Sequence, residues 1–453
     1  MLKDFRSYPS LDLAIDGRLV VLCGENGAGK TNLLEALSLF SPGRGLRRAE
    51  LAECARVGGA GGFALSIEIE EDGATRQLGS AFERGTNVDE AGRRNRIDRV
   101  AVASSRAFCD HVRIVWLTPA MDSLFAGPAS ERRRFLDRFV LAIDPNHGAR
   151  VGQFERALRG RNRLLDEGAR NASWLDAIER EAAELGVAVA AARLECVRRL
   201  EALIAADRDD SSPFPWAKLA LEGEVEMLTA SGPALAAEDR YRAILRDSRR
   251  RDAAAGRTLI GPHLCELSVW HGPKHAPAAS ASTGEQKALI VGLALAHARL
   301  VAEMSGVAPL ALLDEIAAHF DPRRRAALFD ALAQVGGQVF LTGADPAAFA
   351  ELEGRAQTFE VSAETGVRPR PSSGAHSPSR DGRLSTPFAG RTDAGCRPGQ
   401  PLSRKEPRQS SDHRCWSCRT SRIRCRPPWA ASRPSTPSLP NRRRTCRCRS
   451  GSA

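Results

Sequence analysis

The stretch GENGAGKT, from Gly24 to Thr31, follows the apolar run RLVVLC and precedes a segment with helical character that reaches Phe40. It matches G-x-x-x-x-G-K-[S/T], the pattern of a phosphate-binding loop between a strand and a helix. Its glycines let backbone N–H groups point at phosphate oxygens, and the following helix adds its positive N-terminal dipole. Lys30 is expected to reach the β- and γ-phosphates. The loop residues expected to bind ATP are Gly24, Glu25, Asn26, Gly27, Ala28, Gly29, Lys30 and Thr31.

An acidic pair ends a second apolar run, PLALLDE, from Pro309 to Glu315. A carboxylate at the tip of a buried strand beside a phosphate loop can hold Mg²⁺, and a second carboxylate can polarise an attacking water. Both motifs belong at the carboxyl edge of one parallel sheet. We expect Thr31 and Asp314 to be the metal-side residues, and Glu315 to be the general base that acts together with Lys30.

A third polar cluster, STGEQ, opens an apolar helix about thirty residues before the acidic pair. Its residues are Ser282, Thr283, Gly284, Glu285 and Gln286. Small residues and free N–H groups at a helix N-terminus favour a phosphate. Ser282 and Glu285 also form an ordinary capping box, so the cluster taken alone fits a plain helix start equally well.

The composition and the apolar periodicity of the chain change twice within residues 1–360. Residues 1–120 and 256–360 alternate short apolar strands with helices, whereas residues 121–255 are rich in Arg, Glu, Ala and Leu with a helical period. Apolar residues from Leu175 to Cys196 recur at spacings of three and four, and Val151 to Leu165 fit the same register with Arg161 at one seam position. We expect an inserted helical lobe with a short antiparallel coiled-coil hairpin. Two amphipathic helices on a globular core remain the alternative.

The net charge of +11 comes from the last 93 residues of the chain, residues 361–453. Residues 361–453 hold 20 Lys/Arg and 5 Asp/Glu, which leaves 46 basic and 50 acidic residues and a net charge of −4 in residues 1–360. The tail is rich in Arg, Ser and Pro and lacks periodic apolar residues, so we expect disorder there. A frameshift near residue 360 would also explain it, and reading the other two frames of the gene tests that idea.

Membrane and secretory signals are not evident in the sequence. No run approaches about 18 uninterrupted apolar residues, and the N-terminus lacks a signal peptide's apolar segment. Five of the 11 cysteines are scattered singly through residues 1–360, which suits reduced thiols in the cytoplasm. We expect a cytoplasmic protein without a membrane partner.

The order and spacing of the three motifs resemble the phosphate loop, signature and Walker B motifs of ABC-type ATPases. HFDP, from His319 to Pro322, resembles their D-loop and places Asp321 near a dimer seam. FLTGAD occupies the place of the switch strand, although Gly343 stands after Thr342 where transporter subunits carry His. Ala120 lies near where those subunits carry Gln. Both departures argue against a transporter subunit.

A finer resemblance is to the RecF family, bacterial ATPases of DNA replication and recombinational repair that are related to SMC-type heads. It covers residues 1 to about 360 and is carried by stretches such as DFRSYPSLDL, WLTPAMDSLFAGPASERRRFLDRFVLAIDP, TLIGPHLCELSV and LLDEIAAHFDPRRRAALFDAL. Leu264 and Glu266 stand where the family usually has Arg and Asp. The contact that the family's Arg makes is therefore in doubt.

The resemblance implies an α/β, ABC-type P-loop ATPase head that uses ATP and Mg²⁺ and dimerises head to head. Residues 282–286 of one subunit would complete the ATP site of the other. Family members bind gapped or junction DNA, act with RecO and RecR to promote RecA loading, and support the SOS response; slow, DNA-stimulated hydrolysis resets them. The alternatives are a transporter ATPase subunit and an assembly protein that does not hydrolyse ATP.

DNA contacts are harder to locate, because phosphate contact needs only aligned cations. Two basic helical stretches supply the candidates, which are Arg132, Arg133, Arg134 and Arg159. Solvated helix faces with intrahelical ion pairs explain any single one of these arginines at least as well.

Overall fold

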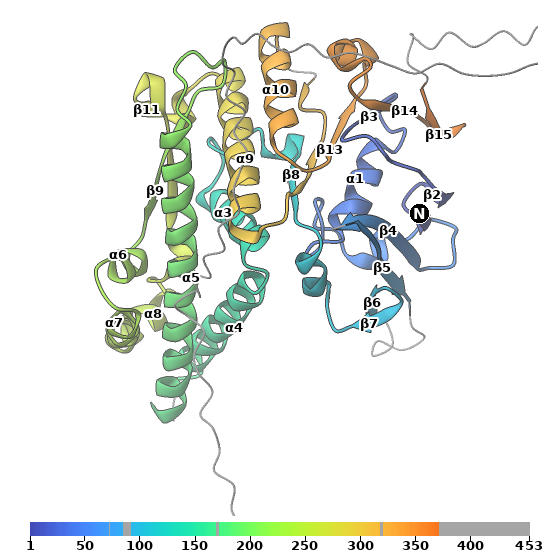
Figure 1. The fold of residues 1–453 in the computed structure, drawn as a ribbon. Helices are drawn as coiled ribbons and strands as arrows, with labels where there is room; N and C mark the ends of the chain where they lie inside the picture. The colour runs from blue at the N-terminus through green and yellow to red at the C-terminus, as the bar shows by residue number, and fades with distance from the viewer. Residues whose placement is uncertain (72, 85–91, 169–171, 318–319, 371–453) are drawn as a thin grey trace, which may run out of the picture. The chain divides into compact units, whose positions relative to one another are not determined.

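The computed structural model describes residues 1–71, 73–84, 92–168, 172–317 and 320–370 (Figure 1). A six-stranded sheet with the order β15-β14-β3-β13-β12-β8 carries the motifs. All its neighbouring strands are parallel except the pair of β14 and β15. The bounds of these strands are β3 (Leu19–Cys23), β8 (Ile114–Leu117), β12 (Leu310–Leu313), β13 (Val339–Gly343), β14 (Gln357–Ser362) and β15 (Gly366–Pro369).

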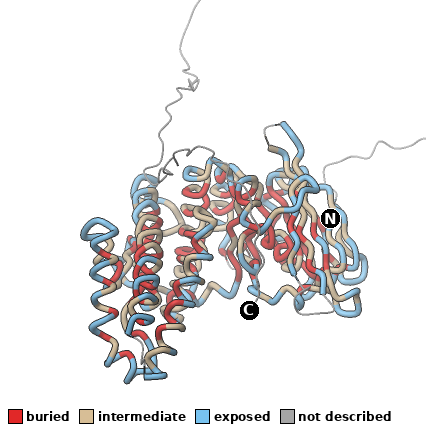
Figure 2. Tube along the Cα trace, turned by 90° about the horizontal axis from the view of Figure 1, so that it is seen from below, coloured by how far each residue is buried: buried red, intermediate tan, exposed pale blue. Residues whose placement is uncertain are grey.

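Both faces of this sheet are covered, which explains why its strands are nearly continuous apolar runs. Along β3, Leu19, Val21 and Cys23 face one core, while Val20 and Leu22 face the other. The first core includes residues of α9 (Thr283–Ser305) and α10 (Pro322–Gln334), and the second includes residues of α1 (Lys30–Ser38). Figure 2 shows the buried residues concentrated along the strands and the helix faces between them.

A second, antiparallel sheet packs on the α1 side in the order β2-β1-β4-β5-β6-β7. Strands β4 and β5 form a hairpin, since Glu71 at the end of β4 pairs with Ala74 at the start of β5. The bounds in this part are β1 (Leu2–Phe5), β2 (Tyr8–Leu11), α2 (Leu51–Cys54), β4 (Phe63–Glu71), β5 (Ala74–Glu83), β6 (Gly92–Ile97) and β7 (Val100–Val102).

The middle of the chain is mainly helical. Its elements are α3 (Ala129–Ile143), α4 (His147–Asp166), α5 (Ala172–Ala206), β9 (Ala217–Glu222), α6 (Glu224–Ala230), α7 (Ala234–Asp247), α8 (Arg249–Ala255), β10 (Glu266–His271) and β11 (Ala276–Pro277). Short 3₁₀ turns are η1 (Ser105–Asp110), η2 (Pro119–Met121), η3 (Pro262–Leu264), η4 (Gly272–Lys274), η5 (Ala278–Ser280) and η7 (Pro346–Leu352). Because β9 pairs with β10, a three-stranded sheet crosses the lobe boundary that the sequence places at residues 255/256.

The helices α4 and α5 lie side by side, as the periodic spacing predicts (Figure 1). Phe154 and Leu158 of α4 share a core with Ala182 and Val187 of α5. Tyr241 of α7 is fully buried in the same core. The seam is therefore covered by a third helix, and the hairpin is part of a small helical bundle.

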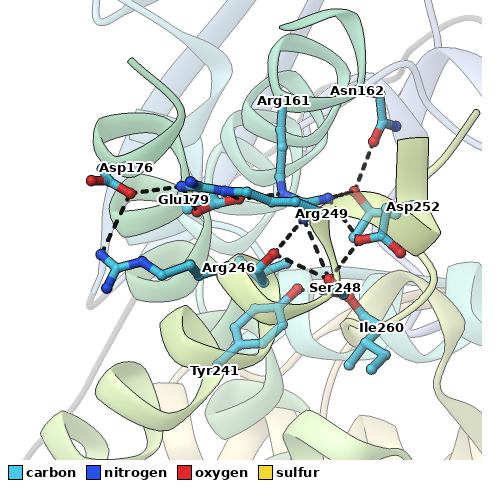
Figure 3. Close-up of polar contacts among 12 residues, drawn as sticks. Arg161, Asn162, Asp176, Glu179, Tyr241, Arg246, Ser248, Arg249, Asp252 and Ile260 are labelled. Carbon is cyan, nitrogen blue, oxygen red and sulfur yellow. Dashed lines mark hydrogen bonds and ion pairs between the residues drawn. The ribbon is translucent and has the colours of Figure 1, made fainter. Parts of the chain in front are cut away.

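Arg161 stands at a seam position because it has buried acidic partners (Figure 3). Its guanidinium is fully buried and pairs with Glu179 of α5 at 3.0 Å and with Asp252 of α8 at 2.8 Å. It also donates to the Leu245 carbonyl at 2.6 Å and to the Thr258 hydroxyl at 2.8 Å. One arginine thus ties α4, α5, α7 and α8 together.

Replacing Arg161 with Ala is expected to lower the free energy of unfolding by about 3–5 kcal/mol, because it leaves a buried carboxylate without its close cation. Asp252 loses its partner at 2.8 Å and keeps Arg251 at 4.0 Å, whereas Glu179 keeps Arg249. Arg159→Ala is the matched control on the same helix. Arg159 is exposed, and its one ion pair within the part of the chain that the structure describes is the i,i+4 contact with Glu155 at 3.8 Å, so a change within about 0.5 kcal/mol is expected. Denaturant unfolding followed by circular dichroism measures both. Equal effects of the two substitutions would contradict the role of Arg161 in holding α4, α5, α7 and α8 together.

The ordered chain continues past the point where the sequence places the tail. Val361 is buried at the end of β14, and β15 pairs back onto β14 as far as Pro369. The expected start of the tail at residue 361 is corrected accordingly, because the strand that lies beside β3 includes these residues. Residues 371–453, for which disorder was expected, lie outside the described residues.

The helix α9 is long and apolar enough to span a membrane by length and composition. Half of its most apolar window is nevertheless buried inside the protein. Its side chains, such as Leu289, Leu293 and Val301, belong to the core on one face of the parallel sheet. It is accounted for as a core helix.

Candidate ATP-binding site

The phosphate-binding loop lies between β3 and α1, as predicted. Gly27 and Gly29 have φ of 86° and 108°, in the left-handed region that favours glycine. A Cβ atom at Gly29 would lie 2.7 Å from the Tyr8 hydroxyl, which donates a hydrogen bond to the Gly29 carbonyl at 3.1 Å. Burial raises the pKa of Tyr8 to about 12, so this hydroxyl keeps its proton. Tyr8, which sequence reasoning missed, supports the loop from behind.

The first residue of the loop is fixed by the strands on both sides of β3. The Gly24 N–H donates to the Gly343 carbonyl of β13 at 3.2 Å. On the other side, a Cβ atom at Gly24 would overlap the Val361 carbonyl of β14. Only glycine fits between these two strands, and Val361 is the first residue of the segment for which the sequence had predicted a disordered tail.

Lys30 begins α1 and is almost fully buried, with 3% of its surface exposed. Its ammonium donates to the carbonyls of Gly24 at 2.7 Å and Glu25 at 2.9 Å, and it lies 4.0 Å from a carboxylate oxygen of Glu315. The cation is thus held against the loop and beside the acidic pair. This is the place where a γ-phosphate needs a fixed positive charge.

Asp314 directly follows β12 and is 5% exposed. The Thr31 hydroxyl donates to both of its carboxylate oxygens, at 2.9 and 3.0 Å. The Thr342 hydroxyl of β13 donates to Asp314 Oδ1, one of these two oxygens, at 2.8 Å. Hydroxyl and carboxylate oxygens are the ligands that Mg²⁺ prefers, usually completed by water and substrate phosphates. The donor set therefore fits Mg²⁺ bound together with a nucleotide.

Within the described ranges, no group of three or more His, Cys, Asp or Glu side chains could hold a metal ion by itself.

Glu315 lies next in the chain, and about a third of its side chain is exposed. Its backbone is left-handed, with φ of 54°, a conformation that costs about 1–3 kcal/mol outside glycine. Its N–H donates to the Thr342 hydroxyl at 2.9 Å. Glu315 lines a small hollow together with Thr118, Asp122 and Phe320. The group is therefore accessible to water, as a general base must be.

The polar cluster at residues 282–286 is the N-terminus of α9. Ser282 and Glu285 form a reciprocal capping box, and the Ser282 N–H donates to Glu285 at 3.1 Å. The pKa of Glu285 falls to about 2, chiefly because Lys274 pairs with it at 2.6 Å. The ordinary role of a helix cap is thus fulfilled. Ser282 and Thr283 are nevertheless exposed, and no hydrogen bond or ion pair among the described residues joins this cluster to its own phosphate loop.

Gln286 of the polar cluster and Asp321 of the predicted D-loop are held by backbone groups. The Gln286 side chain donates to the carbonyls of Ala279 and Ala281, at 3.3 and 2.9 Å. Asp321 caps α10 by accepting from the Arg324 N–H at 3.0 Å. His319, at the start of the predicted D-loop, lies outside the described residues.

The four arginines proposed for DNA contact separate into two kinds. Arg132 forms a bidentate pair with Glu266 at 2.5 and 2.9 Å, and its remaining nitrogen donates to three carbonyls near residue 125. Arg133 donates to the Cys265 carbonyl at 2.7 Å. Arg134 and Arg159 are exposed, and among the described residues their ion-pair partners are intrahelical, Glu131 and Glu155.

The donors of Arg132 are therefore used inside the protein, which disfavours Arg132 as a DNA contact. The pair also gives Glu266, one of the two unusual positions, a defined partner that joins α3 to β10. Leu264, the other, is half exposed on η3. Arg132 and Glu266 lie 134 residues apart, so the sequence held no local signal for their pairing.

Comparison with known proteins agrees with this arrangement. The family described as RecF/RecN/SMC N terminal domain matches residues 1–366. A Mesorhizobium japonicum protein named DNA replication and repair protein RecF is 54% identical over 361 residues, which cover 80% of this chain and 94% of that protein. Its namesake from Brucella abortus is 54% identical over 366 residues, covering 80% and 93%.

Two solved structures share the fold. One is described as the recombination mediator protein RecF with ATP in the RecFOR pathway; its TM-score is 0.70 at 20% identity, covering 82% of this chain and 96% of that one. The other is described as RecF with ATPrS in the same pathway. Its TM-score is 0.69 at 19% identity, and the match covers 80% of this chain and 95% of that one. With the family match, they confirm the predicted ABC-type ATPase head with a helical lobe.

Proposed function

The chain belongs to the RecF family, and from this premise we propose that it is an ATP-dependent DNA-binding protein of replication and recombinational repair. The observation that carries the proposal is the convergence of Lys30, Thr31, Asp314 and Glu315 at one sheet edge. Relatives more than half identical over nearly their whole length are named for DNA replication and repair. A cytoplasmic location and a role in the SOS response follow from the same assignment.

The phosphate loop and Lys30 bind the ATP phosphates, and the Thr31 hydroxyl with Asp314 holds Mg²⁺. The metal ion, when bound, neutralises charge that develops between the β- and γ-phosphates. Glu315 accepts a proton from the water that attacks the γ-phosphate, while Lys30 stabilises the charge on the transferred group. Hydrolysis is slow and DNA-stimulated, and it ends the bound state.

Two copies of the chain complete each other's sites. Ser282, Thr283 and Gly284 stand at a helix N-terminus whose positive dipole favours an anion. Ser282 and Thr283 are exposed while their own loop lies elsewhere, which supports contact with a partner's γ-phosphate. Asp321 lies at the same seam. RecO and RecR are the proposed partners, with RecA loading as the outcome.

The substrate proposed for the ATP-bound dimer is gapped or junction DNA. Arg134 and Arg159 are the exposed cations of the sequence-based set. Arg133, half-buried and bonded through one nitrogen to the Cys265 carbonyl, stays a candidate as well. Aromatic residues are only 5% of the chain, which disfavours base stacking as the main contact. Backbone contact to phosphates is therefore the proposed mode.

The test is binding of the full chain to gapped DNA at one fixed salt concentration, with and without ATP. ATP is expected to tighten binding by about 5–150-fold, the usual range of coupling between two sites. Intact duplex of the same sequence is the DNA control. Equal affinity with and without ATP would contradict the proposed switch.

A further inference from the structure

One buried hydroxyl lies between the two acidic residues of the site. Thr342 stands near the end of β13 and is 1% exposed. Its Oγ1 donates to Asp314 Oδ1 at 2.8 Å and accepts from the Glu315 N–H at 2.9 Å. A threonine hydroxyl has one hydrogen and two lone pairs, so both bonds can exist together. The direction of the hydroxyl hydrogen follows from the Glu315 N–H, which can only donate, so the hydroxyl accepts from it and gives its own hydrogen to Asp314.

The first of these bonds constrains Asp314. Its Oδ1 also accepts from the Thr31 hydroxyl at 2.9 Å, so two hydroxyls from different elements hold one oxygen. Bonds to a charged acceptor are about twice as strong as neutral ones. The carboxylate plane is therefore set by β13 as well as by α1.

The second bond constrains Glu315. The left-handed backbone of this residue needs compensation, and the bond from its N–H to the Thr342 hydroxyl supplies it. The backbone conformation sets the direction of the side chain, which ends 4.0 Å from the Lys30 ammonium. Thr342 thereby helps to aim the carboxylate without touching the nucleotide.

The strand that carries Thr342 also touches the phosphate loop. The next residue, Gly343, accepts from the Gly24 N–H at 3.2 Å. A small displacement of β13 would therefore change the positions of Asp314, Glu315 and Gly24 together.

We infer that Thr342 is a positioning residue that couples the metal-side carboxylate Asp314 to the general base Glu315. The inference rests on the proposed ATP hydrolysis at this site. According to this inference, the Thr342 hydroxyl fixes the Mg²⁺-binding carboxylate of Asp314 and the water-activating carboxylate of Glu315 relative to each other.

The test compares Thr342→Val with Thr342→Ser in the full chain. Valine keeps the shape and removes both hydrogen bonds, whereas serine keeps the hydroxyl. Partners of this kind usually contribute 10–100-fold to metal affinity or activity, so Thr342→Val should need about 10–100-fold more Mg²⁺ for half-maximal ATP binding. The kcat of hydrolysis should fall by a similar factor, with a smaller change in ATP binding measured without Mg²⁺.

Thr342→Ser should restore both quantities to within about threefold of the unaltered chain, a small part of that range. Thr358→Val, on the neighbouring strand β14, is the matched control and should leave both unchanged, because Thr358 bonds neither carboxylate through its side chain. Unchanged Mg²⁺ dependence in Thr342→Val, or equal losses in the valine and serine variants, would overturn the inference. If the unaltered chain does not hydrolyse ATP, the proposed function fails, and the Mg²⁺ dependence of ATP binding still decides the role of Thr342.

Discussion

Lys30→Ala is expected to weaken ATP binding by about 30–150-fold and to abolish ATP-dependent dimerisation. The substitution removes a buried cation held 2.7 Å from the Gly24 carbonyl, and a hydrogen bond to a charged group contributes about 2–3 kcal/mol. Nucleotide affinity is measured by isothermal calorimetry and the dimer by analytical ultracentrifugation. Lys218→Ala, an exposed lysine on β9, is the control and should behave like the unaltered chain. A Lys30→Ala variant that still dimerises with ATP would contradict the assignment of the site.

The same variant tests whether the polar cluster at 282–286 acts on a second copy. Ser282→Arg should also abolish hydrolysis, because the bulky cation obstructs the exposed helix N-terminus. Mixing the two inactive variants creates dimers with one site whose Lys30 and partner Ser282 are both intact. Partial recovery of hydrolysis is expected in the mixture, whereas an action of Ser282 on its own subunit's ATP predicts no recovery.

Glu315→Gln is expected to bind ATP normally while hydrolysing it about 10²–10⁴-fold more slowly, the usual contribution of a general base. Glutamine keeps the side-chain shape but cannot accept the proton from the attacking water. DNA-bound dimers should therefore persist longer, as measured by dissociation from gapped DNA after dilution into ATP-free buffer. Glu303→Gln, an exposed position on α9, is the matched control.

Two results would speak against this role of Glu315. Unchanged hydrolysis would remove it as the base. Slower hydrolysis with an unchanged dimer lifetime would favour an assembly protein that uses ATP binding alone.

The parts of the fold that the sequence predicted are those with local signals. The loop at residues 24–31 and the run that ends at Asp314 each carry their pattern within a few residues, and the structure brings Thr31 and Asp314 into direct contact. The family and the ABC-type head are confirmed by the comparisons. A motif at a strand end needs no tertiary information to be located.

The parts that the sequence did not predict depend on distant partners. Arg132 looked like a surface cation because nothing near it in sequence signals Glu266. Val361 looked like the start of a tail because its neighbours are polar, yet it lies at the end of a strand beside β3. Thr342 was noted only as the residue before a missing His; its two bonds become visible when β12 and β13 are paired.

The placement of β3 between β13 and β14 has a consequence for biosynthesis. Strand β3 leaves the ribosome early, but its hydrogen-bonding neighbours are residues 339–343 and 357–360. At about 5–20 residues per second, roughly 17–70 s separate Cys23 from Val361. Until then Gly24 lacks the strands that fix it, so we expect ATP to bind only after β13 and β14 have joined the sheet. The protein is therefore expected to reach DNA only as a finished chain, and ribosome-bound fragments that end before β14 should neither dimerise nor compete for gaps.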